Sequence, residues 1–194
     1  QLMISLLRSG VDISTPNYQG QAPVHLAIIA GKLKSLYVLV RSGVNVNAPG
    51  MNGATPLHLA TALGFHEAIR LLIQFGAHVN AVDNAGETAL HWAVTEKQER
   101  SLQLLLHAGI GKDIKNYDGE SALFLAVCCG ESRMVEILVA SGADIFETDL
   151  QGNCLIQEAK ASGYSDIVNL LETRGATFSK HHNIVPVIPA YFRV

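Results

Sequence analysis

The stretch "ATPLHLA" at residues 54–60 decides the fold, because looser copies of it recur along the chain. The copies read "APVHLA" at 22–27, "TALHWA" at 88–93 and "SALFLA" at 121–126. Each copy joins a turn-like stretch to an apolar run with helical spacing. Self-similarity of this kind indicates an architecture of stacked repeats.

Glycine and alanine positions show that the period of the repeat is 33 residues. One set of glycines at this interval is Gly10, Gly43, Gly76, Gly109, Gly142 and Gly175. A second set is Gly20, Gly53, Gly86, Gly119 and Gly152. Alanines recur at the same interval: Ala27, Ala60, Ala93, Ala126 and Ala159. The period predicts a partial copy at residues 1–16 and an apolar, proline-containing tail at residues 182–194. Between them it predicts five full copies, at residues 17–49, 50–82, 83–115, 116–148 and 149–181.

The second copy predicts the local structure of each repeat. Its "MNGA" stretch is typical of a turn, and Thr55 suits a helix N-cap. Pro56 suits the first helical position, because its missing N–H would be unpaired there in any case. Gly64 then ends a first helix, and Gly76 ends a second helix that runs over about residues 66–75.

This pattern resembles the ankyrin repeat, and the resemblance covers about residues 1–181. It implies an all-α fold, an ankyrin-repeat solenoid of stacked helix–turn–helix units with β-turn tips. Each helix pair is too small to bury its own apolar face, so it needs neighbouring repeats.

Departures from the pattern mark individual repeats. The third copy lacks the mid-repeat glycine, reading "AVTEKQER", and closes with "GIGKDIK" where the second has "GAHVNAV". We therefore expect the third repeat to be the least regular. The fifth copy carries Glu158 and Glu172 where the second has Leu59 and Ile73. Charge on the face that a following repeat would cover predicts a C-terminal cap.

Composition argues against several classes of protein. Apolar residues make up 48% of the chain and charged residues 16%, which favours a packed core over disorder. The net charge of −3 makes a nucleic acid a poor partner. No apolar run reaches the roughly 18 residues of a membrane-spanning helix. The first residues read as part of a helix, so we expect the chain to belong to a longer protein.

Histidines and cysteines are the candidates for metal or catalytic chemistry. The resemblance implies that His25, His58 and His91, one per repeat, hydrogen-bond the backbone of the turns. A weak surface metal site formed by His181 and His182 is the alternative. We expect Cys128 and Cys129 to be small buried or half-buried residues and not a redox pair, since no C-x-x-C is present.

The sequence predicts no enzyme, no metal and no cofactor, because no catalytic constellation is found. Three cysteines form no disulfide framework, which favours a reducing compartment, the cytosol or the nucleus.

Partner contacts in the resembled family come from the turn tips and the exposed side of the first helix. In the first two repeats the apolar residues at these positions are Tyr18, Ile29, Met51, Leu63 and Val82. In the middle of the array the acidic residues are Glu87, Glu96, Asp118 and Glu120. Tyr117 and Leu150 are further apolar members. We predict a protein or peptide partner with an apolar anchor and basic residues, bound on the concave face. The alternative is that these side chains pack on each other.

The function expected from these features is a non-catalytic interaction module, an adaptor or scaffold. The alternative is a regulatory domain of a larger enzyme or channel that works by intramolecular contact. The tail could cover the last repeat, begin a further domain or dock on another chain.

Overall fold

The computed structural model describes residues 15–176 of the chain. Within these residues the regular elements are ten α-helices and one short 3-10 helix, without any β-strand. The expected all-α class is therefore confirmed. The chain divides into two compact units, Gln1–Gly111 and Lys112–Val194. The predicted partial copy and the tail lie almost wholly outside the described residues.

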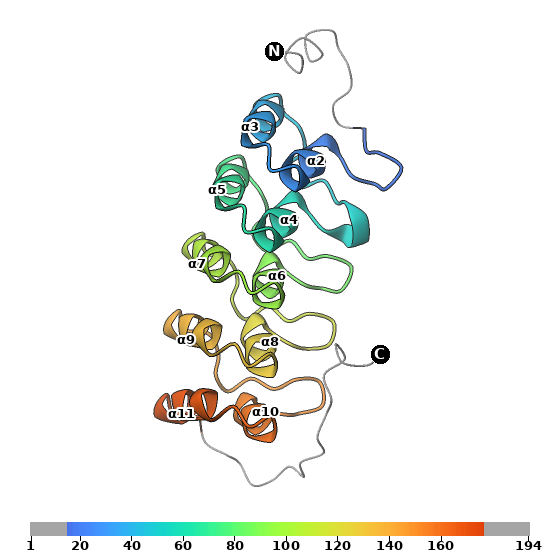
Figure 1. Cartoon of the computed structure of the whole chain (residues 1–194). Helices are drawn as coiled ribbons and strands as arrows, with labels where there is room; N and C mark the ends of the chain where they lie inside the picture. Colours follow the sequence, from blue (N-terminus) through green and yellow to red (C-terminus); the bar gives the residue numbers. More distant parts are fainter. Residues whose placement is uncertain (1–14, 177–194) are drawn as a thin grey trace. The chain divides into compact units, whose positions relative to one another are not determined.

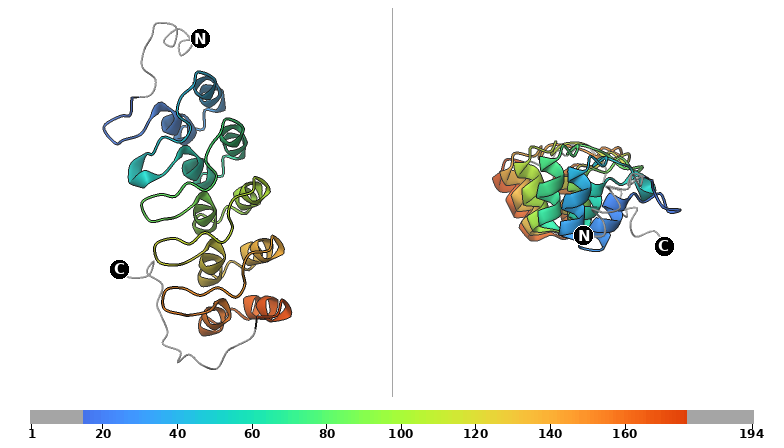
Figure 2. Two further views of the ribbon diagram at one scale, coloured as in Figure 1. Left: turned by 180° about the vertical axis from the view of Figure 1, so that it is seen from behind. Right: turned by 90° about the horizontal axis from the view of Figure 1, so that it is seen from above.

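Unit 1 stacks three helix pairs in two rows (Figure 1). The inner row is formed by α2 (Pro23–Ile29), α4 (Pro56–Ala62) and α6 (Ala89–Thr95), each in contact with the next. The outer row is formed by α3 (Leu33–Arg41), α5 (His66–Gln74) and α7 (Glu99–His107). Seen from behind, the loops that carry the turn tips project on the inner-row side, away from the outer helices (Figure 2).

Unit 2 has the same plan with two pairs. The inner helices α8 (Ala122–Cys128) and α10 (Leu155–Ala161) contact each other, as do the outer helices α9 (Ser132–Ala140) and α11 (Ser165–Thr173). All five inner helices have seven residues and all five outer helices have nine. The repeat period thus fixes the element lengths in both units.

The core of unit 1 lies between the two rows and between successive pairs. Leu57 and Ala60 on the inner row, and Ile69 and Leu72 on the outer row, are almost completely buried. They stand at spacings of three on their helices, so each helix turns one apolar side toward its neighbours. Burial of these side chains supplies the main stabilisation of a repeat array.

The third repeat is as regular as the others, contrary to expectation. Its helices α6 and α7 have the standard lengths. Lys97 has a φ of 54°, and glycines have a positive φ at the same position of the other repeats. Ile110 in the unusual closing loop is buried, at the position of Ala77 in the repeat before it. One lysine in the left-handed conformation therefore replaces the missing glycine without shortening either helix.

The irregular tip belongs to the second repeat. Met51–Gly53 form a 3-10 turn, η1, in which Asn52 has a φ of 55° and a ψ of 25°. The later repeats each close their tip with a single β-bridge, such as that between Val82 and Thr88. Pro49 stands at the position of Val82, and the bond equivalent to that from Asp83 N–H to the Glu87 carbonyl oxygen is kept, from Gly50 N–H to the Ala54 carbonyl oxygen at 2.8 Å.

The fifth repeat carries its two unusual glutamates on adjacent helices. Glu172 on α11 accepts a hydrogen bond from Lys160 Nζ on α10 at 2.9 Å. Glu158 is half-buried, and burial raises the pKa of its carboxyl group. The role of these residues as a cap stays a prediction.

Candidate functional site

The turn tips are held by the first residue of the repeat, which is Asn or Asp in four of the five copies. In unit 1, Asp83 Oδ1 accepts the backbone N–H groups of Ala85 and Glu87, both at 2.9 Å. Asn17 makes the equivalent pair of bonds at the first tip. These bonds fix the backbone locally, so the side chain at the second position of the repeat projects outward.

The second tip cannot use this device, because its first residue is Gly50. A Cβ added at Gly50 would stand 2.9 Å from His25 Nε2, so the close approach of the histidine requires glycine. This tip instead bonds to its neighbour, since Asn84 N–H donates to the Asn52 carbonyl oxygen at 2.9 Å. Met51 is therefore presented by a tip that is anchored to the third repeat.

Buried histidines connect the inner helices to the tips. Each accepts, through Nδ1, the backbone N–H of the residue three positions earlier at 3.1 Å: His25, His58 and His91. Because Nδ1 of His58 accepts, Nε2 carries the proton and donates to the Glu87 carbonyl oxygen at 3.0 Å. Burial lowers the pKa of His25 and His58, which favours the neutral form that these bonds need. The predicted backbone-bonding role of the three histidines is confirmed.

Trp92 joins this network from the third inner helix. Its Nε1–H donates to Asp83 Oδ2 at 3.0 Å, and its ring stands edge-on to His58 with 5.4 Å between the ring centres. Asp83 thus holds its own tip through one oxygen and the inner helix through the other.

The apolar residues predicted to bind a partner in unit 1 are all exposed. Tyr18 is 96% exposed, Met51 52% and Leu63 55%, and Ile29 and Val82 are also open to solvent. Ile29 ends α2 and Leu63 caps α4, so they stand at the same end of neighbouring inner helices. Of the acidic residues, Glu96 is exposed and Glu87 half-buried. We call these seven residues the tip surface.

Unit 2 carries the remaining predicted residues. Tyr117 and Leu150 are each 70% exposed at the second position of their tips, Asp118 is exposed and Glu120 is half-buried. Asn116 Oδ1 accepts the N–H groups of Asp118 and Glu120 at 3.1 and 2.9 Å. This tip is therefore held in the same way as the first and third tips of unit 1.

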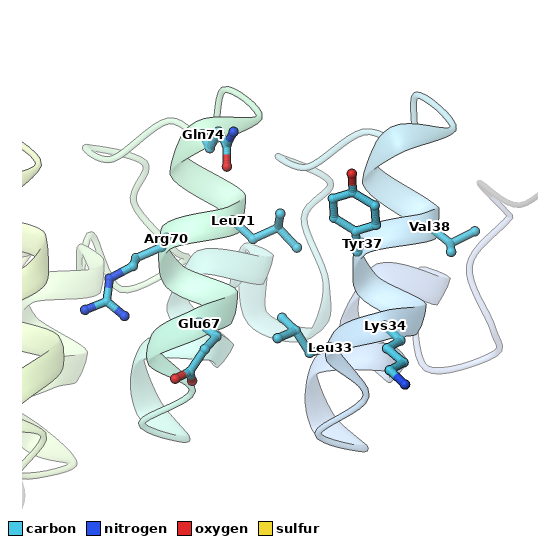
Figure 3. A pocket seen from close by; sticks show the side chains of 8 residues that line it. All are labelled: Leu33, Lys34, Tyr37, Val38, Glu67, Arg70, Leu71 and Gln74. Carbon is cyan, nitrogen blue, oxygen red and sulfur yellow. The ribbon is translucent and has the colours of Figure 1, made fainter.

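A groove between the outer helices α3 and α5 was not predicted from the sequence. It has a volume of about 590 Å³ and is lined by Leu33, Lys34, Tyr37, Val38, Glu67, Arg70, Leu71 and Gln74. Figure 3 shows Leu33 and Leu71 pointing into the gap from opposite sides. Comparison of outer-helix positions between repeats would have revealed it, because Leu33 and Tyr37 are apolar only in the first.

The residues considered for metal or redox chemistry show no site in the described part of the chain. Within residues 15–176 no three His, Cys, Asp or Glu side chains are grouped as metal ligands would be. Cys128 is half-buried, and burial raises the pKa of its thiol, whereas Cys129 is exposed. His181 and His182 lie outside the described residues. None of the helices in the same range is long and apolar enough to cross a bilayer.

Comparisons with known proteins agree with this architecture. The family model described as ankyrin repeats (3 copies) matches residues 25–118 and 101–181. Among solved structures, the ankyrin repeat domain of Bcl-3, a unique member of the IkappaB protein family, is similar with a TM-score of 0.85 and 29% identity, over 91% of this chain and 79% of that one. No curated protein matches the sequence.

Proposed function

The chain belongs to the ankyrin-repeat family, and from this we propose that it is a non-catalytic module that binds another protein through the tip surface. Members of this family are generally protein-interaction modules. The module would act as an adaptor or scaffold. The free cysteines among residues 15–176 support a reducing compartment such as the cytosol or nucleus.

The observation that carries the proposal is the exposure of large apolar side chains on rigid supports. Tyr18, Met51 and Leu63 are more than half exposed, although burial of such side chains is normally favourable. Apolar patches on an otherwise polar surface mark contact sites. The tips and inner helices that carry them are held by backbone hydrogen bonds, so little conformational entropy would be lost on binding.

Charge supports the predicted chemistry of the partner. Glu87 and Glu96 stand in the third repeat, beyond the apolar residues of the first two. A segment with an apolar anchor and a Lys or Arg a few residues away would meet both parts of the tip surface. In unit 2, Tyr117, Asp118, Glu120 and Leu150 repeat the combination of apolar and acidic side chains, and we propose them as a separate contact surface.

The test replaces the apolar anchors of the second repeat. Met51→Glu combined with Leu63→Glu changes exposed side chains only, so the thermal midpoint should stay nearly unchanged. Partners recovered by affinity capture on the wild-type chain should bind the variant at least about tenfold more weakly, because lost hot spots typically cost about 2 kcal/mol or more. Titration calorimetry with each purified partner measures this change.

A matched control changes the outer row. His107→Ala alters an exposed residue in the last turn of α7, at the opposite end of that helix from Glu96. This variant should bind as wild type does. Normal binding by the Met51→Glu/Leu63→Glu variant would contradict the proposal, and so would loss of binding in the α7 control. The contact would then lie elsewhere on the chain.

A further inference from the structure

The groove between α3 and α5 lies on the outer helices, whereas the tip surface lies on the tips and inner helices. Its walls are carbon-rich: Leu33 and Tyr37 come from α3, and Leu71 comes from α5. Leu33 is 36% exposed and Tyr37 49%, so the groove is open to solvent along the helices. Figure 3 shows both side chains on the face of α3 that looks toward α5.

Leu33 and Tyr37 depart from the repeat pattern. At the position of Leu33 the other four repeats carry His66, Glu99, Ser132 and Ser165, and at the position of Tyr37 they carry Arg70, Gln103, Glu136 and Asn169. The fold is built in all five repeats, so stacking does not require an apolar residue at either position. Val38 differs from them, because its counterparts Leu71, Leu104, Ile137 and Leu170 are all apolar.

Both departures fall on one face of one helix. Residues four apart on a helix are neighbours, so Leu33 and Tyr37 make one continuous apolar strip along α3. Two independent departures at adjacent surface positions, both lining one groove, are the pattern of a contact site rather than of scattered surface residues.

The charges around the groove are mainly positive. Lys34 lines it, and Arg41 Cζ stands 6.0 Å from the centre of the Tyr37 ring, against the single carboxylate of Glu67, whereas the Arg70 guanidinium points away from α3 (Figure 3). No ion pair within residues 15–176 involves Lys34, Arg41 or Arg70. The tip surface of the same unit has acidic side chains, so the two surfaces select for opposite charge.

We propose that this groove is a second docking site, which takes an aromatic or branched aliphatic side chain carried on an acidic segment of another protein. The anchor lies between Leu33, Tyr37 and Leu71, and an Asp or Glu beside it meets Lys34 or Arg41. The partner of the groove therefore differs in charge from the partner of the tip surface, and one chain can bind both at once.

The experiment selects displayed random 12-residue peptides on the wild-type chain, with an excess of the Leu33→Ser/Tyr37→Gln chain in solution as competitor. The replacements copy residues that other repeats carry at the same positions, so the variant keeps its helicity and thermal midpoint. Enriched peptides should carry Phe, Trp, Leu or Ile next to Asp or Glu. A synthetic enriched peptide should bind the wild-type chain at least tenfold more tightly than the variant.

Two further variants separate this site from the tip surface. The Met51→Glu/Leu63→Glu chain should bind the selected peptide as wild type does, whether or not the tip surface binds a partner. Lys34→Glu/Arg41→Glu should weaken binding at least tenfold, and so should raising the salt concentration from 50 to 500 mM.

Four results would overturn the proposal: no enrichment, enrichment of basic peptides, equal binding to wild type and the Leu33→Ser/Tyr37→Gln variant, or loss of binding in the Met51→Glu/Leu63→Glu chain. Sedimentation of the wild-type chain as a dimer that the Leu33→Ser/Tyr37→Gln variant abolishes would also overturn it, because the occupant would then be a second copy.

Discussion

At the scale of single residues, the fourth repeat shows how one substitution changes the role of its neighbours. Phe124 stands at the position of His25, His58 and His91, and has no ring nitrogen to accept a hydrogen bond. In the second and third repeats the threonine hydroxyl at the helix start lies 2.8 Å from the histidine Nδ1. Its counterpart Ser121 donates instead to the buried carboxylate of Glu147.

Glu147 makes the stability of unit 2 depend on pH. Burial raises the pKa of its carboxyl group to about 7, against the opposing effects of Ser121 and of Lys115, whose Nζ is 3.9 Å away. Asp113 and Asp144 add to the upward shift of the pKa. From about pH 4.5 to 7 the unfolded chain loses this proton while the folded chain keeps it, so the folded state loses stability as the pH rises.

We expect Glu147→Gln to remove this loss. Between pH 5 and 8 the free energy of unfolding of the wild-type chain should fall by about 2–3 kcal/mol more than that of the variant, from the 1.36 kcal/mol that one pKa unit represents. Urea denaturation at both pH values measures the difference. The buried histidines are the same in both chains, so their contribution to the pH dependence cancels. Glu136→Gln, at an exposed carboxylate paired with Arg133, should behave as wild type. Parallel pH profiles of wild type and Glu147→Gln would contradict the assignment.

Ala93 tests the packing of the central inner helix. It is completely buried in α6 beside Trp92, so a leucine there overpacks the contact with the neighbouring helices and should cost roughly 1–3 kcal/mol. Ala93→Leu should therefore lower the thermal midpoint more than Glu96→Ala, a change at the exposed end of the same helix. Calorimetry of both variants decides the matter, and equal midpoints would argue against the burial of this position.

At the scale of elements, each helix pair depends on a left-handed residue between its two helices. Gly31 has a φ of 62° there and Lys97 a φ of 54°. A residue with a Cβ adopts this conformation at a cost, whereas glycine does so freely. The third repeat therefore has strain in its inter-helix turn that the first repeat avoids.

Exchange of the two residue types should reveal this strain. Lys97→Gly should raise the free energy of unfolding by roughly 0.5–1 kcal/mol, and Gly31→Ala should lower it by about 1 kcal/mol. A Cβ at Gly31 meets no atom within 4 Å, so the loss there reports backbone conformation alone. Chemical denaturation gives both values. A destabilised Lys97→Gly chain would show that the lysine side chain contributes more than its backbone conformation costs.

At the scale of the whole molecule, two compact units share one repeat plan. Leu39 in α3 and Leu138 in α9 occupy the same position of the repeat and are both buried. Truncation of such a side chain to alanine typically costs about 2–5 kcal/mol. Because contacts in repeat arrays are local, the loss should act mainly on the unit that contains the change.

Native-state amide exchange tests this locality. Leu39→Ala should accelerate exchange in α2 to α5 more than in α8 to α11, and Leu138→Ala should have the reverse effect. Each variant is the control for the other, since the residue type and the position in the repeat are matched. Equal acceleration across both units in either variant would show that the chain unfolds as one cooperative body.

The sequence by itself determined the repeat and most of its local structure. Glycine and alanine spacing, the threonine before the second and third inner helices and the apolar positions at helical intervals are local signals, and they predicted the helices correctly. The backbone-bonding role of the histidines in the first three repeats was implied by the resemblance to the ankyrin repeat, and the Nδ1 bonds, made within four residues of chain, agree with it.

Only the tertiary structure decided features that depend on residues about one repeat apart. At the second tip the approach of His25 to Gly50 leaves no room for a side chain at that position, and Glu147 is buried where the chain brings it to Ser121. The groove exists because α3 and α5 lie side by side, which places Leu33 and Tyr37 opposite Leu71. Such approaches are set by the packing of one repeat on the next, and a single repeat read by itself contains no signal for them.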